Sequence, residues 1–80
     1  MNIQQLEYIV SLDKYRHFVR AAEACRVSQP TLSSLINKLE EELDVKIFDR
    51  TSHPVKPTAI GEKIINQAKV VLYNISQLKE

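Results

Sequence analysis

The stretch from Ser28 to Leu43 constrains the fold of this chain more than any other. Its larger apolar side chains recur at the spacing of one helical face: Leu32, Leu35, Ile36, Leu39 and Leu43. Such a stripe predicts an amphipathic α-helix whose apolar side packs on a core. Ser28 suits the N-cap of this helix, and Pro30 suits its first turn because proline has no N–H to leave unpaired there.

The opposite side of this predicted helix carries short, polar and mostly neutral side chains. It presents Pro30, Ser33, Ser34 and Asn37, flanked by Gln29 and Lys38. A solvated helix face usually carries Glu and Lys pairs, whereas Gln, Ser and Asn side chains suit close contact with a second polar surface. We therefore predict that this face enters a DNA groove. The acidic run at 40–44 lies at the far end of the helix and is expected to point outward.

Length and composition limit the remaining possibilities. Eighty residues with one glycine and three prolines indicate a single, mainly α domain. No run approaches the roughly 20 apolar residues of a membrane span, and no signal-peptide pattern follows Met1. The single cysteine excludes an internal disulfide and a cysteine-based zinc cluster, so we expect no cofactor and a cytoplasmic protein. The net charge is only +1, but the acidic run at 40–44 conceals a basic remainder.

Two shorter helices are predicted before Ser28. The first begins after Asn2 and runs to about Lys14, with an inward face of Ile3, Leu6, Ile9 and Val10, and with Tyr8 or Leu12 at its edge. The second begins near His17 and carries a narrow stripe of Phe18, Ala21, Ala22 and Cys25. Small residues let another helix approach closely, and the connection around Val27 is very short. This spacing predicts a helix-turn-helix, with Arg26 at a turn position where many such motifs have glycine. A generic helical hairpin is the alternative.

A small β-hairpin is predicted after the acidic run. Residues 45–51 are expected to form a strand, residues 52–54 a turn and residues 55–57 a short return strand, with Asp44 ending the preceding helix. Pro54 and Pro57 limit this hairpin to an edge or a very short ribbon. A hairpin in this place is called a wing, and wings lie along the DNA backbone or minor groove. A plain surface hairpin is the alternative, above all for His53 and Lys56.

The last predicted helix begins at the N-cap Thr58 and runs to about Leu78. Its length of roughly 33 Å exceeds what a domain of this size needs for its own core. Apolar residues repeat along it as a heptad seam that predicts a homodimer: Ile64, Ile65, Ala68, Val71, Leu72, Ile75 and Leu78. Packing within one chain is the alternative. We therefore divide the chain into a DNA-binding domain at 1–58 and a linker and dimerisation helix at 59–80, and expect it to be the amino-terminal piece of a longer protein.

These motifs together resemble the DNA-binding domain of LysR-type transcriptional regulators. The resemblance rests on MNIQQLEYIVSL, on F-x-x-AAE-x-C-x-VSQPTLSSLINKLEEEL and on IFDRTSHPVKPTAIGE before a long helix. It covers the whole chain without an insertion. It implies a winged helix-turn-helix with a three-helix core and a short two-stranded wing, followed by a long linker helix that pairs antiparallel in a dimer. It also implies a bacterial, usually tetrameric protein that binds imperfect palindromes, with a sensing domain after Glu80.

Within the family, the chain is most similar to the peroxide-sensing regulators. RHF at 16–18, Cys25 and RTSHPV at 50–55 carry this closer likeness, which implies an activator of oxidative-stress genes. A regulator that responds to a small-molecule metabolite is the alternative. Many relatives have Arg at the position of Ser34, and relatives of the peroxide type often have Arg at that of Asn37, so this reading face is unusually neutral.

The expected DNA-binding residues come from three elements. Those of the recognition helix are Ser28, Gln29, Pro30, Thr31, Ser33, Ser34, Asn37 and Lys38, and the family positions that touch bases match Gln29, Pro30 and Ser33. Those of the second helix and the wing are Arg20, Arg50, Thr51, Ser52 and His53. No catalytic residue and no metal ligand is expected.

Three other functions remain possible from the residues alone. An enzyme would use Cys25 with His17 or His53, but Cys25 occupies the apolar stripe, where a buried cysteine behaves as a small hydrophobe. A thiol redox switch at Cys25 is the second alternative. A helical module whose polar face meets a protein is the third, and the salt dependence of binding distinguishes it from a DNA reader.

Overall fold

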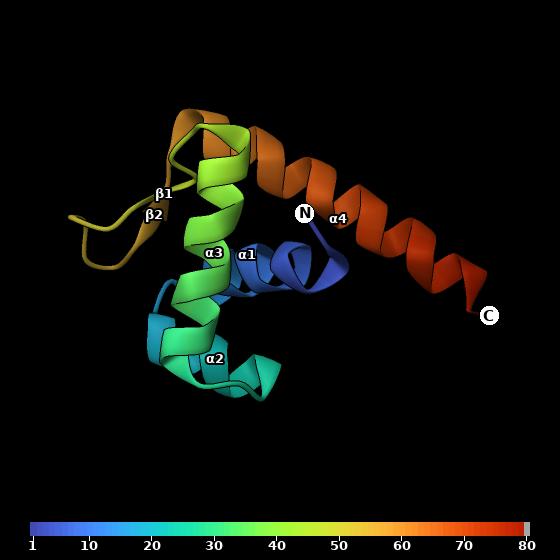
Figure 1. The fold of residues 1–80 in the computed structure, drawn as a ribbon, viewed down its shortest axis with the longest axis horizontal. Coiled ribbons are helices and arrows are strands. Elements are labelled where there is room, and N and C mark those ends of the chain that lie inside the picture. Colours follow the sequence, from blue (N-terminus) through green and yellow to red (C-terminus); the bar gives the residue numbers. More distant parts are fainter. Residues whose placement is uncertain (80) are drawn as a thin grey trace.

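A computed structural model describes residues 1–79. The chain forms α1 (Ile3–Tyr15), α2 (Phe18–Cys25), α3 (Gln29–Leu43), β1 (Phe48–Asp49), β2 (Lys56–Pro57) and α4 (Ala59–Leu78). The first three helices cross one another to form the core, the β1–β2 hairpin projects from one side, and α4 extends towards the other (Figure 1). This arrangement confirms the predicted fold of a mainly α winged helix-turn-helix followed by a long helix.

Side-chain caps start each of the four helices in residues 1–79. Asn2 and Gln5 form a reciprocal capping box on α1, and His17, Ser28 and Thr58 each accept a backbone N–H at the start of α2, α3 and α4. These caps satisfy N–H groups that have no partner inside the helix. The predicted N-caps at Asn2, Ser28 and Thr58 are therefore confirmed.

Three of these helices end at a left-handed residue that is not glycine. The φ angles are 57° at Arg16, 59° at Arg26 and 55° at Asp44. Each costs about 1 kcal/mol relative to a right-handed conformation, and the capping N–H bonds of these residues offset that cost. The turn position of Arg26 and the helix end at Asp44 were predicted, whereas the left-handed ending of α1 at Arg16 had no sequence signal.

The core lies where α1, α2 and α3 meet. Leu32, Ile36 and Leu39 of α3 are completely buried, and Ala21 and Ala22 of α2 occupy the crossing. The predicted stripe and crossing are thus confirmed, since small residues let the helices approach closely.

The inward face of α1 differs from its predicted face. Ile3 is 49% exposed, whereas Tyr8 and Leu12 are buried, together with the polar Gln5. Gln5 is buried because its Nε2 donates to the backbone oxygen of Leu35 at 3.0 Å, which joins α1 to α3. The prediction for Ile3 was therefore wrong.

The hairpin is shorter than predicted, with only two residues in each strand. Phe48 pairs with Pro57 and Asp49 pairs with Lys56 in antiparallel register. The segment before Phe48 does not join the ladder because its backbone is already bonded elsewhere: Val45 N–H donates to the Glu40 carbonyl and the Ile47 carbonyl accepts from Thr58 N–H. Similarly, Val55 N–H donates to the Arg16 carbonyl at the end of α1.

The first half of α4 packs against α1. Ile65 and Ala68 are only 2% and 3% exposed, and Lys69 Nζ lies 3.8 Å from Asp13 Oδ2 of α1. Ile65 and Ala68 therefore belong to the core of their own chain, which corrects the predicted dimer seam at these two positions. Gly61 permits the close approach, since a Cβ there would lie 2.0 Å from the backbone oxygen of Ile47.

The second half of α4 extends beyond this contact (Figure 1). Val71 is 36% exposed and Leu78 is 87% exposed, while Leu72 and Ile75 are half-buried. The apolar part of the seam that remains accessible thus runs from Val71 to Leu78. Within residues 1–79, none of the helices combines the length and apolar character needed to cross a bilayer.

Candidate nucleic-acid interface

The N-terminal end of α3 presents its polar side chains to solvent. Ser28 Oγ accepts from Thr31 N–H at 3.2 Å and donates to Thr31 Oγ1 at 2.9 Å. Gln29 Nε2 donates to Ser33 Oγ, one helical turn later, at 2.9 Å. These bonds stay within the first turns of the helix, and Gln29, Pro30, Thr31 and Ser34 are exposed. The structure thus puts these predicted residues on one accessible surface.

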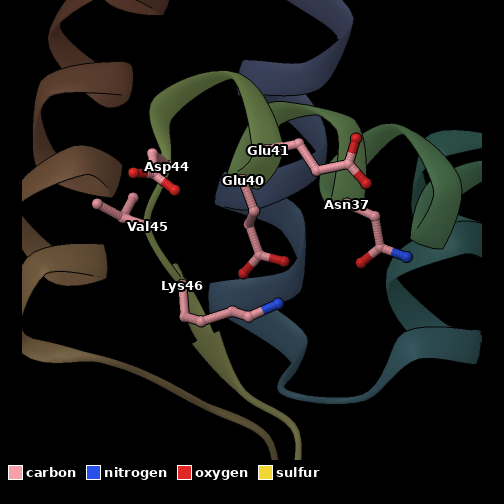
Figure 2. Close-up of a pocket in the computed structure, with 6 residues that line it drawn as sticks. All are labelled: Asn37, Glu40, Glu41, Asp44, Val45 and Lys46. Carbon is pink, nitrogen blue, oxygen red and sulfur yellow. The ribbon is translucent and has the colours of Figure 1, made fainter.

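The C-terminal half of α3 differs because Glu40 turns inward. Its side chain is only 3% exposed, which corrects the prediction that the whole acidic run points outward. Glu40 Oε2 accepts from the backbone N–H of Ile47 at 2.7 Å and of Phe48 at 3.3 Å. Figure 2 shows the carboxylate reaching from α3 towards the segment that carries Lys46, while Glu41 turns away. Burial of this charge is tolerated because each carboxylate oxygen has a donor.

Arg50 supplies the donor to the other carboxylate oxygen of Glu40. Its Nη1 lies 3.0 Å from Glu40 Oε1, and its Nη2 donates to Asn37 Oδ1 at 2.8 Å. The guanidinium carbon also lies 5.6 Å from the centroid of the Phe18 ring, within cation–π range. The Arg50 side chain is 32% exposed. Arg50 therefore joins the hairpin to α3 and α2, a role that the sequence analysis missed.

One sequence signal pointed to the buried position of Glu40. It lies four residues after Ile36 and three before Leu43, so it borders the apolar stripe of α3. A carboxylate there needs a cationic partner, and Arg50 follows ten residues later. The partner itself was not predictable, because its position depends on the path of the hairpin.

The hairpin tip is small, polar and largely exposed. Asp49 Oδ1 accepts from Thr51 Oγ1 at 2.6 Å and from Thr51 N–H at 2.9 Å, while Ser52 Oγ donates to the Pro54 carbonyl at 3.0 Å. The hydroxyl and then the N–H of Thr51 lower the pKa of the Asp49 carboxyl below its ordinary value of 3.8, with a smaller contribution from the charge of Lys56. His53 and Lys56 are exposed beside this tip.

Residues from all three predicted elements surround one hollow of about 610 Å³. Arg20 of α2, Gln29 of α3, and Arg50 and His53 of the hairpin line it, together with the apolar Phe18. Asn37 and Lys38 lie farther along the exposed side of α3, and Asn37 is joined to this group through Arg50. The structure thus brings Arg20, Gln29, Arg50 and His53 around one hollow and joins Asn37 to them through Arg50.

The residues considered for catalysis are not brought together. Cys25 is half-buried and lines a second hollow with Tyr8 and Leu72, whereas His17 and His53 line the hollow beside α3. His17 is already used as the N-cap of α2. In the part of the chain that the structure describes, no group of three potential metal ligands is found.

Comparison with known proteins adds an independent line of evidence. Residues 3–62 match the family described as "Bacterial regulatory helix-turn-helix protein, lysR family". Over 80 residues, the chain is 51% identical to the hydrogen peroxide-inducible genes activator of Haemophilus influenzae, with all of this chain and 27% of that relative covered. The chain thus spans about a quarter of that relative's length.

Two solved structures have nearly the same fold. A complex of the BenM DBD with catB site 1 DNA superimposes with a TM-score of 0.95 at 36% identity, covering 98% of this chain and 84% of that one. A full-length OxyR variant from Pseudomonas aeruginosa gives 0.94 at 48% identity, covering 99% of this chain and 27% of that one. Since the family match spans most of the sequence and both neighbours share this fold, the chain belongs to the lysR family of bacterial regulatory helix-turn-helix proteins.

Proposed function

We propose that this domain binds double-stranded DNA as part of a bacterial transcriptional regulator, with α3 in the major groove and the β1–β2 hairpin along the backbone or minor groove. The observation that carries this proposal is the exposed polar face of α3, which adjoins the hairpin on a fold nearly identical to that of a protein solved with DNA. The major groove is wide enough to admit one α-helix.

We assign recognition of the DNA bases to the first turns of α3. Gln29 is exposed at the helix start, where its carboxamide offers both a donor and an acceptor to adenine. Ser33 and Ser34 offer shorter contacts one turn later. The backbone N–H groups and the positive end of the α3 dipole suit a phosphate, and the exposed cations Arg20 and Lys38 add attraction that does not depend on sequence.

The acidic residues fit this orientation. Glu40 is neutralised by Arg50, and Glu41 and Glu42 are exposed at the end of α3 that is farther from Gln29. Insertion by the N-terminal half keeps these carboxylates away from the phosphates.

The domain is proposed to act as a homodimer through the second half of α4. Val71, Leu72, Ile75 and Leu78 leave an apolar strip that its own core covers only in part. Pairing of two such helices, antiparallel as the family resemblance suggests, would present two copies of α3 to successive turns of one DNA face, about 34 Å apart. An imperfect palindrome is the matching site, and two dimers give the proposed tetramer.

A peroxide-responsive activator of the OxyR type is the proposed regulatory class, acting in the cytoplasm at the nucleoid. Support comes from the name and 51% identity of the Haemophilus influenzae relative and from the 48% identity to an OxyR structure. The role is regulatory rather than catalytic. Transcription of a target gene should rise when cells that contain the protein meet hydrogen peroxide; a response to a metabolite alone would support the alternative class.

Mobility-shift measurements with Gln29→Ala test the DNA-binding proposal. The variant should lose roughly fivefold to 100-fold in affinity for a selected site, while its affinity for random DNA stays nearly unchanged. Lys38→Ala is the matched control, since losing a phosphate contact weakens binding to both DNAs equally. Binding that does not weaken as salt is raised would contradict the proposal.

Sedimentation of Ile75→Asp tests the dimer. A carboxylate within the apolar strip should produce monomers and weaken binding to a DNA with two half-sites. Asn74→Asp adds the same charge at an exposed position of α4 and should remain dimeric. A dimeric Ile75→Asp variant would mean that another surface pairs the chains.

A further inference from the structure

The guanidinium of Arg50 bonds two side chains of α3 at the same time. One guanidinium nitrogen donates to Glu40 Oε1 and another donates to Asn37 Oδ1. Glu40 and Asn37 are three residues apart on α3, so they lie on adjacent turns and one planar guanidinium reaches both.

The chemistry of arginine fixes the orientation of the Asn37 carboxamide. Arginine carries only N–H donors and no acceptor, so the group that faces Arg50 must be the carboxamide oxygen. The Nδ2 amide group then points away from Arg50. In the view of Figure 2, the Asn37 oxygen lies on the side of Glu40 and the nitrogen on the far side.

Gln29 differs in this respect. Its carboxamide is bonded to the hydroxyl of Ser33, and a hydroxyl both donates and accepts. Either end of the Gln29 carboxamide therefore satisfies Ser33, whereas only the oxygen of Asn37 satisfies Arg50.

Arg50 itself is held away from alternative partners. It neutralises the Glu40 carboxylate, whose side chain is only 3% exposed. Its guanidinium also packs beside the Phe18 ring. Turning Arg50 towards a phosphate would leave Glu40 without its counter-charge in a buried position, which is strongly unfavourable.

We propose that Arg50 is a positioning residue that holds the Asn37 oxygen on its own side and presents the Nδ2 amide of Asn37 to DNA as the donating end, and that this arrangement makes Asn37 select guanine over adenine in the major groove. Guanine offers two acceptors there, N7 and O6, whereas a bidentate pair with adenine needs the oxygen and the nitrogen of one carboxamide. The inference rests on the proposed function, since it requires α3 to lie in the groove.

Site selection from a random DNA pool with Arg50→Lys tests the proposal. Lysine keeps the positive charge beside Glu40 but lacks the planar fork that bonds both partners. The Asn37 carboxamide is then able to turn over, and the preference for guanine at one position of each half-site should fall by roughly fivefold to 100-fold. Urea denaturation of the same variant checks that the fold is retained.

Asn37→Asp provides a second variant that keeps an acceptor for Arg50. Its outward group is also an acceptor, so the preference at that position should change from guanine to cytosine, whose N4 amino group donates. If Arg50 had a purely structural role, Arg50→Lys would leave the preferred base unchanged. Asn37→Ala is the control: it should lose the guanine preference, and adding Arg50→Lys to it should change no base preference further.

Two results would overturn the inference: the guanine preference stays intact in Arg50→Lys, or no base position depends on Asn37. In each case the wild-type domain still selects a DNA site, so the proposed function stands. If the wild-type domain selects no DNA site, both the proposed function and this inference are contradicted.

Discussion

The two ends of α3 are built in different ways. At the N-terminal end, Ser28 and Gln29 bond only to side chains and backbone within the first turns of the same helix, and the face is exposed. At the C-terminal end, Glu40 bonds to the backbone N–H groups of Ile47 and Phe48 at the start of β1, and to Arg50 directly after β1. One end of the helix is anchored to the rest of the fold, and the other is left for recognition.

The backbone of Ile47 is central to the anchored end. Its N–H donates to Glu40 of α3, and its carbonyl accepts from the N–H of Thr58, the cap of α4. Gly61 of α4 packs directly against the same carbonyl. Three elements therefore meet at the backbone of one residue, so changes here should affect stability much more than changes at the reading end.

The largest effect is expected for Glu40→Ala. This change leaves the N–H groups of Ile47 and Phe48 without their acceptor and Arg50 without its counter-charge. Loss of one partner of a buried ion pair costs about 3–5 kcal/mol, a large part of the stability of a domain this size. Urea denaturation measures the loss. Glu41→Ala, at an exposed position of the same turn, is the control, and equal stability of the two variants would refute the anchoring role of Glu40.

The next largest effect is expected for Gly61→Ala. The new Cβ would lie 2.0 Å from the oxygen and 2.8 Å from the carbonyl carbon of Ile47, so backbone must move. Overpacking of this kind costs about 1–3 kcal/mol, which exceeds the gain of about 1 kcal/mol from replacing a helical glycine. Thermal denaturation compares it with Lys63→Ala, an exposed α4 position. A more stable Gly61→Ala variant would show that α4 does not pack closely on the β1 segment.

A smaller effect is expected for Ser28→Ala at the reading end. The change removes the acceptor of Thr31 N–H at the start of α3. Loss of an N-cap costs about 1 kcal/mol, and Ser34→Ala, on the exposed face, should stay within about 0.5 kcal/mol of the parent. If Ser28→Ala proved as destabilising as Glu40→Ala, the contrast between the two ends of α3 would be lost.

The reading end was also the more predictable from sequence. Helix caps and amphipathic stripes depend on residues within one or two turns, so Ser28, Thr58 and the stripe of α3 were recognised from spacing alone. The turn at Arg26 followed from its position between two helices. The predicted DNA contacts, Gln29 and Ser33 among them, follow from the same periodicity and remain predictions.

The anchored end depended on partners distant in sequence. Glu40 turns inward because Arg50 and the backbone at 47–48 supply donors, and Gln5 is buried because it reaches Leu35 on another helix. The strands are short because neighbouring backbone groups bond to helix ends. Ile65 and Ala68 fit a dimer seam and an internal core equally well by spacing, and only the path of α4 over α1 distinguishes these alternatives.

The smallest effect is expected at the hairpin tip, beyond the anchoring contacts. Thr51→Val removes the hydroxyl that donates to Asp49 Oδ1, the main cause of the lowered Asp49 pKa. A lowered folded-state pKa means that the Asp49 carboxylate adds to stability above its unfolded pKa and that this contribution is lost as pH falls through the folded value. Thr51→Val should therefore raise the Asp49 pKa towards 3.8, as measured by NMR titration. Ser52→Ala, which removes only the bond to the Pro54 carbonyl, should leave that pKa unchanged. An Asp49 pKa that moves equally in both variants would mean that the whole tip orders the carboxylate, and the hairpin beyond Arg50 would then belong to the anchored region.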